Sequence, residues 1–142
     1  MSTRSENAYR NFLSGYNCCQ SVMLACRDLT GLDEETVLML SSGFGGGIAG
    51  TRNVCGTVIG MVMVANMMNG YTTPKDMIAK KRVNTVVQKL LGDFQEQNGS
   101  LICGELLGLK PVKGTNQKIP KKRPCPLLCQ DAVEILEKNL DF

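Results

Sequence analysis

Apolar residues recur in this chain with the spacing of an α-helix, and no stretch alternates with the period of two that is typical of a strand. The clearest stripe runs from Val83 to Phe94, downstream of a Thr73-Pro74 pair that favours a helix start. Further helices are predicted over residues 5–14, 17–29, 33–43, 54–68 and 126–140, with a short turn at 103–107. The sequence therefore predicts an all-α fold, a single-domain bundle of five or six helices over residues 1–142, with one glycine-rich and one basic loop.

Residues that can cap a helix stand before four of these segments. Asn17 and Asp33 precede the second and third helices, Asn53 precedes the fourth, and Thr73 precedes the longest. Their side-chain oxygens can accept hydrogen bonds from the unpaired N–H groups of a first helical turn. We therefore expect helices to begin directly after these four residues.

The chain has seven cysteines and no histidine, which restricts its chemistry. Without imidazole, histidine metal ligands, Ser-His-Asp triads and Cys-His nucleophile pairs are excluded. Thiolates remain as the candidate reactive groups, so any enzymatic activity would be that of an oxidoreductase. An odd number of cysteines in a reducing compartment argues against a static disulfide framework.

The N-terminal residues lack the apolar core of a signal peptide. The most apolar run, Val58 to Met68, is about half the length that a membrane-spanning helix requires. We therefore expect a cytoplasmic protein that does not enter a membrane.

Four cysteines fall where helices are predicted to start: Cys18, Cys55, Cys103 and Cys125. Unpaired N–H groups and the positive end of the helix dipole lower the pKa of a thiol in such a position. Four thiolates are also the ligand set of an iron–sulfur cluster or a closed zinc site. Their spacing is dispersed and contains no Cys-x-x-Cys pair, so burial as small apolar residues stays open as an alternative.

The other three cysteines fit structural roles better. Cys26 and Cys129 lie within apolar helical stripes, so both are predicted to pack in the core. Cys19 points about 100° away from its neighbour Cys18 on a helix, and it is interpreted as structural.

Five segments resemble the redox-active family known by its C_GCAxxG_C_C signature: Tyr16-Asn17-Cys18-Cys19-Gln20-Ser21-Val22, Ser42-Gly43-Phe44-Gly45-Gly46-Gly47, Cys55-Gly56-Thr57-Val58-Ile59-Gly60, Cys103-Gly104-Glu105-Leu106-Leu107-Gly108 and residues 125–135. The resemblance spans nearly the whole chain. It implies a small helical redox protein of bacteria or archaea, whose characteristic cysteines correspond to Cys18, Cys55, Cys103 and Cys125. Thr57 departs from the family pattern, which usually has alanine there.

Three functions are compatible with these residues. The leading hypothesis is electron transfer or redox sensing, with a redox partner protein, through an iron–sulfur cluster on Cys18, Cys55, Cys103 and Cys125. The second is a metal-free thiol–disulfide protein that uses the same four cysteines. The third is a helical binding module in which these cysteines hold a structural zinc ion.

The glycine-rich loop is expected to shape the cysteine site. Gly45, Gly46 and Gly47 are not followed by a Walker ending or preceded by a strand, so nucleotide binding is not expected. Together with Gly56 and Gly60 on the next helix, they would let the backbone pass close to the site. The Gly56 and Gly60 face is also a candidate contact for a homodimer.

The basic loop, residues 110–123, carries six lysines and arginines and no acidic residue. It contains no aromatic residue for base stacking, so we expect no nucleic-acid partner and interpret it as a solvated loop. As an alternative, Lys122 and Arg123 would favour the thiolate of the nearby Cys125 and attract anionic substrates or acidic redox partners.

Overall fold

The computed structural model describes residues 2–120 and 123–140. The helices in these ranges are α1 (Thr3–Leu13), α2 (Cys18–Ala25), α3 (Arg27–Thr30), α4 (Glu34–Ser41), the 3₁₀ helix η1 (Ser42–Phe44), α5 (Gly56–Asn69), α6 (Met77–Asn98), α7 (Cys103–Leu106) and α8 (Cys125–Asn139). Within the described ranges, extended pairing is limited to an isolated antiparallel bridge between Val54 and Ile102. The prediction of an all-α fold is confirmed.

Two of the four predicted caps begin their helices as expected. The side-chain oxygens of Asn17 and Asp33 accept hydrogen bonds from the backbone N–H groups of Gln20 and Thr36, at 2.9 and 3.2 Å. Each bond satisfies an N–H group that has no partner within its helix. Cap chemistry within four residues of sequence was therefore sufficient to place these helix starts.

The other two cap predictions are wrong. Helix α5 begins at Gly56, because Asn53 donates its backbone N–H to Gly47 O at 2.8 Å and stays in the loop. Helix α6 begins after Asp76, whose carboxylate accepts from the backbone of Ala79 at 3.0 Å, three residues beyond the predicted Thr73.

The predicted helix over residues 17–29 is two helices. Helix α2 ends at Ala25, and Cys26 adopts a non-helical backbone with φ −109° and ψ 21°. The short helix α3 follows and ends at Thr30, and Gly31, with a φ of 72°, occupies the left-handed position after it. This break redirects the chain toward α4.

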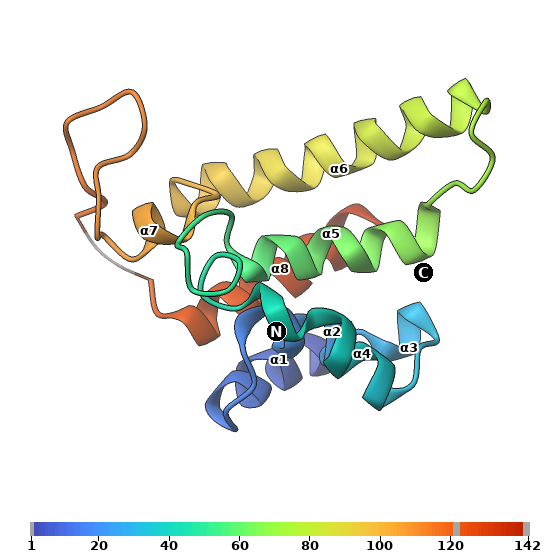
Figure 1. Ribbon diagram of the computed structural model, residues 1–142, viewed down its shortest axis with the longest axis horizontal. Helices are drawn as coiled ribbons and strands as arrows, with labels where there is room; N and C mark the ends of the chain where they lie inside the picture. Colours follow the sequence, from blue (N-terminus) through green and yellow to red (C-terminus); the bar gives the residue numbers. More distant parts are fainter. Residues whose placement is uncertain (1, 121–122, 141–142) are drawn as a thin grey trace.

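Helix α8 lies at the centre of the bundle and packs against α1, α2, α5 and α6 (Figure 1). The largest fully buried side chains include Phe94, Leu90, Met23, Met61 and Leu136. Burying each apolar side chain of this size stabilises the fold by about 1.5–3 kcal/mol. The glycine-rich loop, α7 and the start of α8 gather at one end of this framework (Figure 1).

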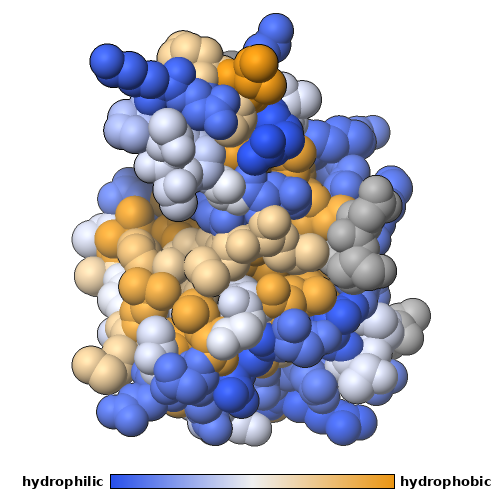
Figure 2. Space-filling model, turned by 90° about the vertical axis from the view of Figure 1, so that its right-hand side faces the viewer, coloured by the Kyte–Doolittle hydropathy of each residue, from blue (hydrophilic) through white to orange (hydrophobic). Residues whose placement is uncertain are grey.

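The opposite end of the molecule exposes apolar side chains. Met39, Met67 and Ile78 are 70, 49 and 84% exposed, and Figure 2 shows an apolar band across this face. They come from α4, the end of α5 and the start of α6. Among the described helices, none combines the length and the apolar character needed to cross a lipid bilayer.

The Gly56 and Gly60 face, the candidate dimer contact, is covered within the chain itself. A Cβ at Gly60 would lie 3.1 Å from Cys19 O and 3.2 Å from Val22 Cβ, both on α2. A Cβ at Gly56 would lie 2.5 Å from Phe44 O. Because helix α2 and η1 occupy this face, the predicted dimer contact through it is wrong.

Candidate redox site

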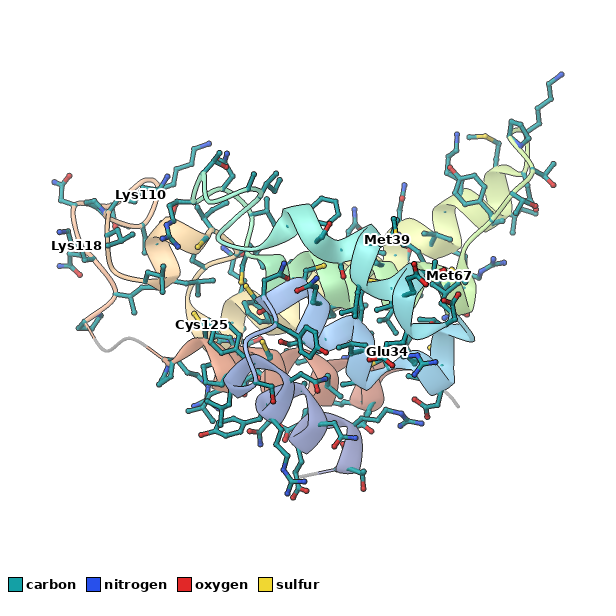
Figure 3. All side chains as sticks on the ribbon, turned by 60° about the horizontal axis from the view of Figure 1, so that its bottom comes forward. Glu34, Met39, Met67, Lys110, Lys118 and Cys125 are labelled. Carbon is teal, nitrogen blue, oxygen red and sulfur yellow. The ribbon has the colours of Figure 1, made fainter. Side chains whose placement is uncertain are left out.

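A pocket of about 450 Å³ lies at the end of the molecule where the glycine-rich loop meets α7 and α8. Three of the four predicted cysteines line it, namely Cys18 from α2, Cys103 from α7 and Cys125 from α8. Figure 3 shows Cys125 at the start of α8, at the same end as the basic loop. The rest of the lining consists of Phe12, Gly15, Tyr16, Asn17, Gly45, Gly46, Arg52 and Leu107. Folding thus brings together sulfurs that are far apart in the sequence.

Backbone hydrogen bonds connect the segments that carry Cys55 and Cys103. The N–H of Cys55 donates to Leu101 O at 2.8 Å, and the N–H of Cys103 donates to Asn53 O at 2.7 Å. These bonds flank the Val54–Ile102 bridge, so the start of α5 and the start of α7 are held side by side.

Cys55, the fourth predicted cysteine, lies behind the pocket and not in its wall. Its side chain is 4% exposed. Burial, followed by the proximity of Cys18, raises the pKa of the Cys55 thiol to about 12. Cys55 therefore keeps its proton at neutral pH.

The half-buried Cys125 follows the same trend. Burial raises its pKa, the nearby Cys18 and Cys103 raise it further, and Arg52 lowers it. The predicted lowering of thiol pKa at helix starts is therefore wrong for Cys55 and Cys125, because the loss of hydration outweighs the helix terminus.

Cys129 is a neighbour of the site that sequence analysis assigned only to the core. It is fully buried one turn after Cys125, and its Sγ lies 3.6 Å from Thr57 Oγ1 and 3.8 Å from Cys18 O. Burial raises its pKa well above the ordinary value. The sequence did contain a signal that Cys129 lies near the site: it follows Cys125 by four residues, and this spacing places both side chains on one helix face.

Cys19 and Cys26 are buried, as predicted, with 0 and 1% exposure. Burial raises the pKa of each thiol to about 12. Cys26 is near Arg4, Asp28 and Glu137, away from the pocket lining, whereas Cys19 is influenced by Cys18 and Cys55.

Arg52 is the second residue that sequence analysis missed. Its Nη1 lies 3.6 Å from Cys103 Sγ, and this hydrogen bond raises the pKa of the guanidinium, with further contributions from Cys125 and Cys18. The signal in the sequence was an arginine between the glycine-rich loop and Cys55. A cation here can pair with a thiolate or with another anion in the pocket.

Arg123, which was predicted to support the thiolate of Cys125, pairs with another residue. Its Nε and Nη2 donate to the two carboxylate oxygens of Asp131 at 2.6 and 2.8 Å. Asp131 is 1% exposed, so this bidentate pair neutralises a buried carboxylate and fixes the chain just before α8. The cation that acts on Cys125 is Arg52, and Lys122 lies outside the described residues.

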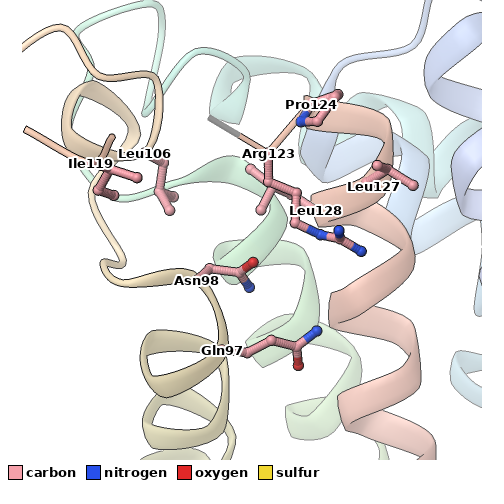
Figure 4. A pocket seen from close by; sticks show the side chains of 8 residues that line it. All are labelled: Gln97, Asn98, Leu106, Ile119, Arg123, Pro124, Leu127 and Leu128. Atoms are coloured by element: carbon pink, nitrogen blue, oxygen red, sulfur yellow. The ribbon is translucent and has the colours of Figure 1, made fainter. Parts of the chain in front are cut away.

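A second pocket, of about 410 Å³, lies between the end of α6, α7 and the start of α8 (Figure 4). Its lining comprises Gln97, Asn98, Leu106, Ile119, Arg123, Pro124, Leu127 and Leu128. Both amide atoms of Asn98 are buried, with no hydrogen-bond partner among the described residues. The lining contains no sulfur, so this pocket is separate from the thiol chemistry.

All seven cysteines are free thiols. Over residues 2–120 and 123–140, no three or more cysteine, aspartate or glutamate side chains are arranged as a group that could hold a metal ion.

A family model matches residues 16–139, and its description reads "Putative redox-active protein (C_GCAxxG_C_C)". The chain belongs to this family. The resemblance inferred from the sequence is therefore confirmed. The matched range contains all seven cysteines of this C_GCAxxG_C_C protein.

The family member is also similar to a protein from Archaeoglobus fulgidus that is described as "Uncharacterized protein". The two are 25% identical over 135 residues, which cover 87% of this chain and 84% of the relative. No solved structure is significantly similar to the chain.

Proposed function

We propose that this C_GCAxxG_C_C protein is a thiol–disulfide redox protein that reacts through Cys18, Cys103 and Cys125. The observation that carries this proposal is that three free thiols from separate helices line one pocket beside the guanidinium of Arg52. Thiols that share a pocket can be joined in pairs by oxidation and separated again by reduction.

The exposure of the thiols supports a different role for each in this proposal. Cys125 is half-buried and the other six cysteines are buried, so Cys125 is the thiol that meets an incoming partner. Cys125 forms a disulfide with the oxidised partner, and Cys18 or Cys103 then attacks this disulfide and displaces the partner. The two pocket thiols lose two electrons and two protons as they form one disulfide, and the partner takes up these electrons and protons.

The thiols behind the pocket do not compete in this reaction. The pKa of Cys55 is raised to about 12 and that of Cys129 is well above its ordinary value, both chiefly through burial. The thiolate is the nucleophile, so these two groups are inert at neutral pH.

A second candidate function is electron transfer through an iron–sulfur cluster. Its support is the donor set: Cys18, Cys103 and Cys125 around the pocket and Cys55 behind it would supply the four thiolates that such a cluster requires. A bound cluster would supply one-electron chemistry. The described side chains are not grouped as metal ligands, so cluster binding would require them to turn toward a common centre. Zinc on the same four residues would have a structural role.

Anaerobic purification followed by elemental analysis, a visible spectrum and mass spectrometry of alkylated protein tests these functions. We expect metal-free protein in which oxidation joins Cys125 to Cys18 or Cys103 and reduction restores the free thiols. Cys125→Ala should abolish this disulfide. Cys26→Ala is the control that should leave it unchanged, because Cys26 lies away from the pocket lining.

Other results would overturn the thiol–disulfide proposal. Iron and sulfide with visible absorption would support the cluster. One equivalent of zinc, with unfolding on chelation, would indicate a zinc-stabilised scaffold. Metal-free protein without a reversible disulfide would contradict all three functions.

A further inference from the structure

The glycine-rich loop contains a left-handed turn, which L-amino acids rarely form. Five consecutive residues, Gly46 to Gly50, have positive φ angles, including 69° at Ile48 and 52° at Ala49. Arg52 is also left-handed, with φ 65°. Each such residue other than glycine costs about 1–2 kcal/mol, and strain of this kind concentrates at functional sites.

Hydrogen bonds from both sides hold Arg52 at the end of this turn. Its backbone N–H donates to Gly46 O at 2.9 Å, and its carbonyl accepts from the N–H of Gly104 at 3.1 Å. The neighbouring Asn53 is held in the same way, between Gly47 and Cys103, at 2.8 and 2.7 Å. The strained backbone is thus fastened to the segment that carries Cys103.

The side chain of Arg52 supplies the charge of the pocket. When the cysteines are protonated, Arg52 is the one residue with a formal charge among those described as lining the pocket. Within the described part of the chain, no carboxylate forms an ion pair with it, whereas Arg4 and Arg123 are paired with acids. Its guanidinium is exposed and contacts Cys103 Sγ, so a molecule that enters the pocket meets a cation beside a sulfur.

We propose that Arg52 makes the pocket selective for small disulfides that carry a carboxylate. The carboxylate pairs with the guanidinium, and the apolar side chains of Phe12 and Leu107 contact the rest of the molecule. This inference rests on the proposed thiol–disulfide function and specifies its substrate class.

The reaction balances without any further reagent. The thiolate of Cys125 attacks one sulfur of the substrate, a protein–substrate disulfide forms, and the substrate S–S bond breaks to release one thiolate. Cys18 or Cys103 then attacks Cys125 Sγ and releases the second half as a thiolate. Two protein thiols are oxidised, one substrate disulfide is reduced, and the two protons from the protein end on the two product thiols.

The test compares three small disulfides as oxidants of the fully reduced protein: anionic dithiodiglycolate, neutral hydroxyethyl disulfide and cationic cystamine. Rates of thiol release are measured at low and high ionic strength. We expect Arg52→Gln to lower the ratio of the anionic to the cationic rate by about ten-fold, because one exposed ion pair with the anion is lost and one repulsion of the cation is relieved. Arg52→Lys should retain most of the selectivity, and high salt should reduce it in the unaltered protein.

Two variants control for net charge and for folding. Lys113→Gln removes one positive charge from the exposed basic loop, outside the pocket lining, and should leave the ratio unchanged. Arg52→Asn is the second neutral variant, because asparagine tolerates the left-handed backbone at this position. Circular dichroism establishes that each variant is folded.

The possible failures are distinguishable. If all three disulfides oxidise the pocket thiols and Arg52→Gln leaves the ratio unchanged, the selectivity is overturned and the redox function stands. If Arg52→Gln slows all three reactions equally, Arg52 acts on the thiols alone, which also overturns the selectivity. If none of the three disulfides reacts with the pocket thiols, the proposed function itself fails.

Discussion

Buried thiols make the stability of this protein sensitive to alkaline pH, and Cys26 measures the effect away from the pocket lining. Burial raises the pKa of Cys26 from 9.0 to about 12. Between these values the folded protein keeps a proton that the unfolded chain loses. Stability that is fully present below pH 9 therefore decreases as the pH rises toward 12.

The size of this loss of stability follows from the difference between the pKa of the thiol in the folded protein and its pKa in the unfolded chain. Between these two pKa values, each such thiol lowers the free energy of unfolding as the pH rises, by roughly 1 kcal/mol at pH 10 relative to pH 7. Cys19 and Cys55 have pKa values raised to about 12 for the same reason. The three thiols together thus remove on the order of 3 kcal/mol at pH 10, a large part of the total stability of an ordinary domain.

The test substitution is Cys26→Ala. The free energy of unfolding is measured by urea unfolding with far-ultraviolet circular dichroism, at pH 7 and pH 10 under reducing conditions. We expect the variant to lose roughly 1 kcal/mol less stability than the unaltered protein between the two pH values. Val37→Ala, at another fully buried position, is the control that lowers stability equally at both. An equal loss in Cys26→Ala and the unaltered protein would refute the assignment of alkaline sensitivity to buried thiols.

Three further predictions concern packing around the two pockets. Gly47→Ala would bring a Cβ within 2.6 Å of neighbouring atoms and should lower the free energy of unfolding by about 2 kcal/mol or more. Gly31→Ala is the control, because Gly31 has a similar φ and no atom within 4 Å, and it should lower the free energy of unfolding by about 1 kcal/mol. Equal losses of stability in urea unfolding would contradict the role of crowding at Gly47. Asn98→Leu removes two buried amide atoms without partners and should raise stability by about 1 kcal/mol, and a loss of stability would mean that the amide is partnered. A double-mutant cycle of Thr57→Ala and Cys129→Ala should give a coupling of about 0.5 kcal/mol or more, and strict additivity would show that their contact contributes nothing.

Local signals in the sequence were sufficient to predict most of the helices. Asn17 and Asp33 cap the helices that follow them, because the hydrogen bonds of a cap reach only three residues along the chain. Asn53 failed as a cap because residues 53–55 are held extended by hydrogen bonds to residues 101–103, a pairing across nearly fifty positions. No helical pattern in the sequence could reveal that pairing.

The candidate site was predictable in position but not in electrostatics. Cys18, Cys103 and Cys125 were selected because they stand at helix starts, and they line one pocket. The sign of the pKa shift at Cys125 was wrong, since it depends on how deeply the assembled fold buries the thiol. Arg52 was missed because its approach to Cys103 depends on a left-handed turn, which no regular sequence pattern indicates.

The electrostatic environment of the cysteines changes from the interior of the bundle to the surface, and we propose that this change determines which thiols react. On the inner side, Cys129 contacts Thr57, and burial keeps its proton in place. Thr57, which departs from the family pattern, lies 3.6 Å from Cys129, so its hydroxyl and the Cys129 thiol satisfy one another as hydrogen-bond partners. On the outer side, Arg52 places a positive charge beside Cys103 and lowers the pKa of Cys125 against the effect of burial. We therefore expect oxidation to favour the thiols that face the pocket, because Arg52 offsets there a part of the cost of removing water from around a thiolate.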